Sequence, residues 1–153
     1  MTLLLALLSI GLTFQAPATA QHAHDRANDA MGFDQARTTH HFRIEAAGGA
    51  IEVTAKDPKD QASIDQVRMH LQHITSMFAN GDFSIPMLVH DQTPPGADEM
   101  KARRDKMTFS FESLPAGGRV AIKTTDGRAR EALHEFLRFQ IREHKTGDPL
   151  QPK

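Results

Sequence analysis

The sequence predicts an α+β fold, in which two ββα units form a four-stranded antiparallel sheet with two main helices on one face. Two pairs of short segments alternate polar and apolar residues around a Gly-Gly dipeptide, and each pair is followed by a stretch with helical periodicity. The two halves repeat this order at an offset of roughly 66 to 69 residues. The length suits one domain, so we expect a single domain over residues 38–148, with repeat units at about 38–82 and 107–148.

The first 20 residues are expected to be a secretory signal peptide. The run Leu3–Leu12 is almost entirely apolar but too short to span a bilayer, and Ala18-Thr19-Ala20 supplies small residues for cleavage. No Lys or Arg precedes the run, which is unusual for such a signal. A buried N-terminal helix is the alternative, disfavoured because the run has no polar face. We therefore expect a periplasmic or secreted protein that begins at Gln21.

Both ends of the mature chain are expected to be tails. Residues 21–37 offer few apolar anchors, so only Met31 and Phe33 are expected to dock. His22 and His24 lie near the new α-amine, where an imidazole can help to bind Cu(II); a solvated tail is the alternative. Residues 149–153 form the C-terminal tail.

The two hairpins are predicted from strict alternation. Residues 41–45 and 50–54 flank Gly48-Gly49, and residues 108–112 and 119–123 flank Gly117-Gly118, so each Gly-Gly pair is expected at a hairpin tip. Alternation sends every second side chain to the helix-covered face. The side chains expected to be buried there are Phe42, Ile44, Ile51, Val53, Phe109, Phe111, Val120 and Ile122.

The two main helices are predicted over Ser63–Ala79 and Arg128–Lys145. Ser63 is the expected N-cap of the first and Gly81 its expected C′ residue. Apolar residues recur at i, i+3 and i+4 in both, so each has a core stripe. The first stripe is Ile64, Val67, Leu71, Ile74 and Phe78; the second is Leu133, Phe136, Leu137, Ile141 and, in the last turn, His144.

The segment between the two units is predicted to be irregular. Phe83–His90 is apolar but contains Pro86, so an edge strand or an extended loop is expected. A Pro-rich turn follows, and Ala97–Met107 is expected to add a short helix. A loop anchored at both ends by regular structure is a common place for binding residues, although the turn could equally be a plain connector.

Composition narrows the function classes. The chain has nine His and seven Met but no Cys, so imidazole and thioether are its only soft or borderline metal ligands, and a thiolate copper site is excluded. A disulfide framework is excluded as well. A formal net charge of −1 makes neither nucleic acid nor an acidic membrane surface an expected partner, and no stable membrane insertion is expected.

The first candidate metal site is His70-x-x-His73-x-x-x-Met77. Residues at i, i+3 and i+7 share one helix face, so three donors could bind one ion. The alternative is that His70 and Met77 pack at the core margin while His73 is solvated.

A strand and a loop could add donors to this site. His40 shares a strand face with Phe42, toward the helices, whereas His41 points outward; a buried His40 bonded to backbone is the alternative. Met87 and His90 are candidate loop donors. The full set of candidate metal ligands is His40, His70, His73, Met77, Met87 and His90.

Imidazole and thioether together favour copper, with zinc as the alternative. Three carboxylates that lie nearby in sequence keep a zinc or non-haem iron site open; they are Asp65, Asp91 and Asp98.

The stretch from Met31 to Asp148 resembles a family of uncharacterised small exported bacterial proteins. The motifs that carry the resemblance are Met31-Gly-Phe-Asp-Gln, Thr39-His40-His41-Phe42, Arg68-Met69-His70-Leu71, Pro94-Pro95-Gly96 and residues 134–141, His-Glu-Phe-Leu-Arg-Phe-Gln-Ile. Members are sometimes labelled aspartate carbamoyltransferase, yet this chain has no Ser-Thr-Arg-Thr phosphate loop and is too short for that enzyme. The resemblance therefore implies no activity.

Three function classes follow. We expect an exported metal-binding protein, most simply a copper chaperone or buffer, whose partner is a metal ion. A non-catalytic interaction module, with an open sheet face or edge strand that binds a partner protein, is the first alternative. A small metal-dependent enzyme is the second: His134-Glu135 or the histidines could support general base chemistry, but no nucleophile elbow, Walker loop or His-Glu-x-x-His motif is present.

Overall fold

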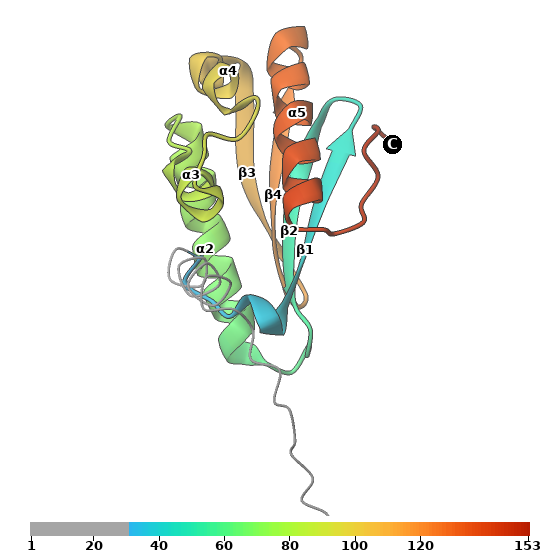
Figure 1. The fold of residues 1–153 in the computed structure, drawn as a ribbon. Coiled ribbons are helices and arrows are strands. Elements are labelled where there is room, and N and C mark those ends of the chain that lie inside the picture. The colour runs from blue at the N-terminus through green and yellow to red at the C-terminus, as the bar shows by residue number, and fades with distance from the viewer. Residues whose placement is uncertain (1–30) are drawn as a thin grey trace, which may run out of the picture.

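The computed structural model describes residues 31–153 and confirms the α+β fold within them (Figure 1). The predicted signal peptide and residues 21–30 of the predicted tail lie outside the described residues. The elements in chain order are η1 (Gln35–Arg37), β1 (Thr38–Glu45), β2 (Gly48–Ala55), α2 (Gln61–Ala79), α3 (Ser84–His90), α4 (Ala97–Ala102), η2 (Arg104–Lys106), β3 (Met107–Leu114), β4 (Gly117–Thr124) and α5 (Gly127–Glu143).

The four strands form one antiparallel sheet in the order β1-β2-β4-β3. The two predicted hairpins are both present, and β2 joins them by pairing with β4. The register puts one apolar residue of each strand in a row across the helix-covered face. That row is Phe42, Ile51, Val120 and Phe111.

The Gly-Gly pairs are not at the hairpin tips, which corrects the prediction. The two-residue turns are Ala46-Ala47 and Pro115-Ala116, and each Gly-Gly pair opens the second strand of its hairpin. The glycines are needed because the central strands and the helices approach closely there. A Cβ on Gly117 would lie 2.1 Å from the backbone oxygen of Val53, and one on Gly49 would lie 2.3 Å from Leu137 Cδ1.

The two main helices cover the same face of the sheet, as predicted, but each covers the other unit's hairpin. Helix α2 follows β2 yet packs chiefly on β3 and β4, and α5 follows β4 yet packs chiefly on β1 and β2. Leu71 of α2 reaches Gly118 of β4, while Leu137 of α5 reaches Gly49 of β2. The two ββα units are therefore interlocked around one core.

The helix ends differ from the prediction by a few residues. Asp60, not Ser63, is the N-cap of α2, and its carboxylate accepts from the Ser63 N–H at 3.2 Å and the Ser63 hydroxyl at 2.5 Å. Gly81 is the left-handed C′ residue, as predicted, with φ +75°. Helix α5 is capped by Asp126 and ends at Glu143, and Lys145 takes the left-handed position after it with φ +52°.

The predicted edge strand or loop at residues 83–90 is wrong, because Ser84–His90 is the short helix α3. Pro86 is the third residue of this helix, where its missing N–H has no intrahelical partner to lose. Asp82 accepts a hydrogen bond from the Ser84 N–H at 2.9 Å and helps the helix begin. Helix α4 confirms the short helix predicted within residues 97–107, but it ends at Ala102.

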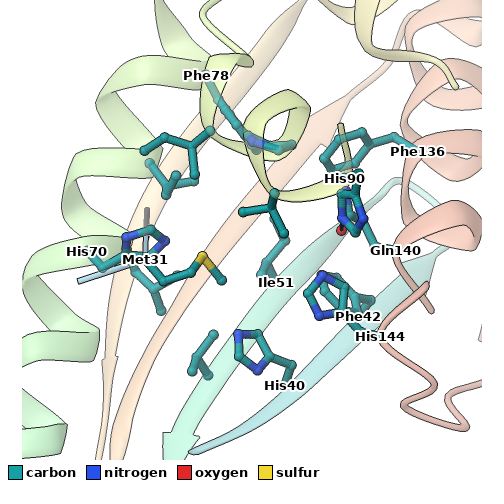
Figure 2. A pocket seen from close by; sticks show the side chains of 16 residues that line it. Met31, His40, Phe42, Ile51, His70, Phe78, His90, Phe136, Gln140 and His144 are labelled. Carbon is teal, nitrogen blue, oxygen red and sulfur yellow. Dashed lines mark hydrogen bonds between the residues drawn. The ribbon is translucent and has the colours of Figure 1, made fainter. Parts of the chain in front are cut away.

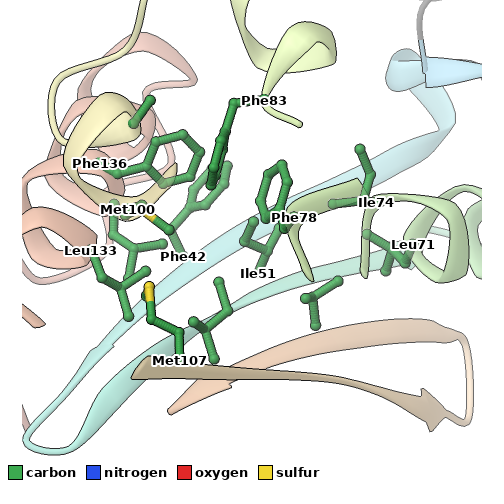
Figure 3. Packing of buried hydrophobic residues seen from close by; sticks show 14 of the residues in the cluster. Phe42, Ile51, Leu71, Ile74, Phe78, Phe83, Met100, Met107, Leu133 and Phe136 are labelled. Atoms are coloured by element: carbon green, nitrogen blue, oxygen red, sulfur yellow. The ribbon is translucent and has the colours of Figure 1, made fainter. Parts of the chain in front are cut away.

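One hydrophobic core lies between the sheet and the helices (Figure 3). At its centre, Phe78 of α2 stacks on Phe83 and meets Phe136 of α5 edge to face. The predicted buried residues are confirmed, apart from His144, which is half-buried, and two phenylalanines, Phe109 and Phe111, which are only half-buried as well. Both phenylalanines belong to β3, an outer strand with no neighbour on one side.

The two ends of the described chain both pack on the domain. Phe33 is buried and Met31 contacts the core, as expected for the tail. The C-terminal residues run along the edge of β1: Asp148 accepts from the Phe42 N–H at 3.0 Å, and the Lys153 N–H donates to the Ile44 carbonyl at 3.2 Å. None of the helices within residues 31–153 is long and apolar enough to cross a bilayer.

Candidate functional site

A cavity of about 50 Å³ lies between the sheet and helices α2, α3 and α5 (Figure 2). Four histidines line it, each from a different element. They are His40 of β1, His70 of α2, His90 at the end of α3 and His144 directly after α5. Met31 also lines the cavity, and Figure 2 shows its sulfur between the rings of His70 and His40.

Local structure explains why each ring faces the cavity. His40 follows strand alternation and shares the inner face with Phe42, as predicted. His70 lies beside Leu71 and Ile74 on the flank of the α2 core stripe. His144 is the C-cap of α5 and continues the stripe of Leu137 and Ile141 beyond the last turn.

The rings form a chain of aromatic contacts. The ring centres of His40 and His144 are 5.3 Å apart and nearly parallel, and those of His144 and His90 are 5.1 Å apart and perpendicular. The ring of Phe33 lies between those of His40 and His70. Its centre is 5.8 Å from the His40 ring centre and 5.3 Å from that of His70. His40, His90 and His144 are therefore one cluster, and His70 stands across the cavity from it.

Burial keeps three of the four cavity histidines uncharged: His40, His70 and His144. Desolvation, with a smaller contribution from neighbouring His41, lowers the pKa of His40 from 6.5 to about 4. Desolvation lowers the pKa of His70 to about 4 and that of His144 to about 3, and the neighbouring histidines add to both shifts. At neutral pH these three side chains carry a free nitrogen lone pair.

Two buried polar atoms at the cavity have no hydrogen-bond partner among residues 31–153. They are His40 Nε2 and Gln140 Nε2. Gln140 uses its side-chain oxygen to accept from His90 Nε2 at 2.9 Å. A buried donor or acceptor without a partner costs about 1–3 kcal/mol, so a ligand that satisfied these atoms would recover part of that cost.

As the side chains stand, the cavity is not an assembled metal centre. Within residues 31–153, no three His, Asp or Glu side chains are placed to hold one metal ion. The nearly parallel rings of His40 and His144 explain this, because stacked imidazoles do not aim their nitrogens at one point. Binding of an ion here requires at least one ring to rotate.

The structure divides the predicted ligands into two groups. His40, His70 and His90 line the cavity, but His73, Met77 and Met87 do not. His73 is exposed on the outer side of α2, Met77 packs at the core margin, and Met87 is exposed on α3. His73 and Met77 therefore do not share the cavity with His70, and the predicted site of these three donors on one helix face stays a prediction.

Sequence reasoning missed two lining residues, His144 and Gln140. Helical spacing was the available signal, because Gln140 and His144 are four residues apart and therefore share a face of α5. His144 stood out only as a buried residue of its helix, and nothing in its local sequence pairs it with His40, which lies 104 positions earlier.

The two other histidines of residues 31–153, His134 and His41, have structural contacts. His134, a candidate for general base chemistry, is buried, and its Nε2 donates to the carbonyls of Glu45 and Gly48 at 3.0 Å each, which fastens α5 to the β1-β2 turn. His41 points outward, as predicted, and its Nδ1 donates to Asp148 at 3.0 Å. Asp148 also accepts from Arg43 at 2.8 Å.

No family model, no curated protein and no solved structure matches this chain. The resemblance to a family of exported proteins therefore stays a prediction, and the case for a function rests on the residues.

Proposed function

We propose that the chain is an exported copper-binding protein, a chaperone or buffer, that holds the metal in the histidine-lined cavity. His40, His90 and His144 are the proposed primary ligands, and Met31 or His70 supplies the fourth donor. Zinc is the alternative metal. The observation that carries the proposal is the convergence of four imidazoles from four elements on one cavity.

The protonation state of the cavity supports metal binding. A histidine must lose its proton before it can coordinate a metal, so a lowered pKa removes the competition from protons. The pKa values of His40, His70 and His144 are about 4, 4 and 3. These imidazoles are ready to coordinate throughout the neutral and mildly acidic range.

The donor types favour copper. The side chains that line the cavity include imidazoles and one thioether but no carboxylate, and the chain has no thiolate. Imidazole with thioether suits copper, whereas Mg²⁺, Ca²⁺ and Mn²⁺ prefer oxygen ligands. Imidazoles alone would also suit Zn²⁺, which keeps zinc as the alternative.

The spacing of the rings suits shared coordination. Two imidazoles bound to one ion through nitrogens about 2.0 Å away, at a tetrahedral angle, have ring centres about 5 Å apart. The separations of His144 from His40 and His90 are 5.3 and 5.1 Å. Both separations match this value, and His40 Nε2 has no hydrogen bond to break within residues 31–153.

Export remains part of the proposal on sequence grounds. The apolar run and the Ala-Thr-Ala motif of residues 1–20 support it, and so does the use of His and Met in place of Cys. The helix-centred site and the His22/His24 tail are competing locations for the metal.

Titration with Cu(I) and Cu(II) tests the proposal. The mature protein is expected to bind one equivalent, and a His40→Ala, His144→Ala double variant to lose at least about tenfold in affinity, because two of its ligands are gone. His73→Ala is the matched control, since His73 is exposed and outside the cavity. Equal affinities for the double variant and the wild type, or a loss in the control variant alone, would contradict the cavity site.

The other two function classes have less support. An interaction module would need a free edge or face. The β1 edge is covered by the C-terminal residues, which leaves β3 as the edge without a neighbouring strand among residues 31–153. On the open face, Arg119 pairs with Glu45 and Glu52 of the neighbouring strands. The enzyme hypothesis loses one of its candidates, because His134 is committed to backbone carbonyls.

A further inference from the structure

A second cavity, of about 370 Å³, opens at the surface between η1, the start of β1 and the segment after α5. We call it the outer cavity. His40 and His144 line both cavities, so they form the wall between them. Lys56 and Lys145 line the outer cavity, and no Asp or Glu does. Its charge is therefore opposite to what a metal cation would need and suits an anion.

Lys145 lines the outer cavity and has an unfavourable backbone conformation. Its φ is +52°, in the left-handed region that glycine usually takes at the end of a helix. The helix end is well formed: the Thr146 N–H donates to the Ile141 carbonyl at 3.2 Å, and the Lys145 N–H donates to the Arg142 carbonyl at 3.3 Å. A non-glycine residue here costs about 1 kcal/mol or more, which points to a use for its side chain.

Lys56, the second lysine that lines the outer cavity, is fixed by two hydrogen bonds. Its ammonium group donates to the Ala36 carbonyl at 2.8 Å, and its backbone N–H donates to the Arg37 carbonyl at 2.9 Å. Neither Lys56 nor Lys145 forms an ion pair within residues 31–153. Both positive charges are therefore available to a ligand.

The edge of β1 adds a backbone donor. The Phe42 N–H points away from β2 and donates to Asp148. Backbone groups of an antiparallel strand alternate in direction, so the His40 N–H faces the same edge, where the outer cavity lies. Asp148 does not oppose an anion there, because its carboxylate is already bound by Phe42, His41 and Arg43.

We propose that the outer cavity binds a small molecule through an oxyanion group, a carboxylate or a phosphate. Lys145 and Lys56 neutralise its charge, and the His40 N–H donates to one of its oxygens. This site is separate from the metal cavity behind His40 and His144, and it does not depend on the proposed copper binding.

Titration of the metal-free mature protein with inorganic phosphate and, in a second series, with citrate tests the proposal. Amide chemical shifts are followed by NMR at low ionic strength, where screening is weak. With at least one probe, we expect saturable shifts at the amides of His40, Lys56 and Lys145. The probe that binds more tightly tells whether phosphate or carboxylate is preferred.

A pair of charge-matched variants decides whether the two lysines hold the anion. Lys56→Gln combined with Lys145→Gly is expected to lose at least about tenfold in affinity, since two charge-assisted contacts are removed. The Gly also suits the left-handed backbone, so the helix end is retained. Lys59→Gln combined with Lys123→Gln removes the same charge from exposed positions outside the cavity and should bind like the wild type. Absence of saturable shifts with both probes, or equal affinity in the two double variants, would overturn the proposal.

Discussion

Replacing His144 by Phe should make the protein less sensitive to acid. The pKa of His144 is lowered from 6.5 to about 3, chiefly by burial. Between these two pH values His144 is therefore protonated in the unfolded chain but not in the folded chain. Stability is therefore lost as the pH falls below about 6.5. At pH 5, which is about 1.5 units lower, this one residue costs about 2 kcal/mol, at about 1.4 kcal/mol per pKa unit.

Phe is the chosen substitute because it keeps the ring contacts without titrating. The His144 ring lies 5.3 Å from the rings of both His40 and Phe42, and an aromatic ring at this position preserves that packing. Urea unfolding at pH 7 and pH 5, followed by circular dichroism, gives the drop in the free energy of unfolding. We expect the drop to be about 2 kcal/mol smaller in His144→Phe than in the wild type.

A matched control separates burial from histidine content. His73→Gln removes an exposed histidine of α2 and should leave the wild-type drop unchanged. If His144→Phe and the wild type lost the same free energy between pH 7 and pH 5, the reasoning that His144 is held uncharged in the cavity would be refuted.

Four further substitutions test the fold by chemical denaturation. Gly96→Ala should lower the free energy of unfolding by at least about 2 kcal/mol, because Gly96 has φ +82° and a Cβ would lie 2.0 Å from the Ala132 carbonyl oxygen. Gly127 has open space around it, so Gly127→Ala should raise the free energy of unfolding by about 0.5 kcal/mol. Equal effects of the two substitutions would contradict the backbone geometry. Phe78→Ala should lower the free energy of unfolding by about 3–5 kcal/mol, since this side chain is 1 % exposed at the core centre. A loss below about 1 kcal/mol would contradict the central position of Phe78 in the core. Lys145→Gly should gain about 1 kcal/mol by relieving the left-handed backbone, and a loss of stability would contradict the strain.

The sheet was predictable because its signals are local. Alternation over five residues on each side of a Gly-Gly pair predicts both hairpins. It also predicts that Phe42 and Val120 lie on the buried face of the sheet. The exact role of the glycines was not predictable, since the close approach of Gly117 to Val53 depends on strands that are far apart in the sequence. The swapped packing of the two helices depends on the same long-range arrangement.

The error at residues 83–90 has a local cause. Pro86 and the apolar composition favour an extended segment on sequence grounds, but proline is tolerated in the first turn of a helix. The signal that distinguishes the two cases is Asp82, whose side chain accepts from the Ser84 N–H just before the helix starts. Asp60 played the same part in α2, three residues before the serine that was predicted as the cap.

Only part of the cavity was predictable. His40 and His70 face inward because of strand and helix periodicity, which the sequence shows directly. Their proximity to His144 follows from the packing of α5 on β1, which brings residues 104 positions apart to a ring separation of 5.3 Å. Periodicity says which face a side chain is on, but not which distant element covers that face.

X-ray absorption spectroscopy of the copper-loaded mature protein tests the cavity site most directly, with a His22→Ala, His24→Ala variant measured beside it. We expect two or three imidazoles at about 2.0 Å, with or without one sulfur, and the same spectrum from both proteins. A spectrum without imidazole scattering, or one that loses its imidazoles in the tail variant, would contradict copper binding at His40, His90 and His144.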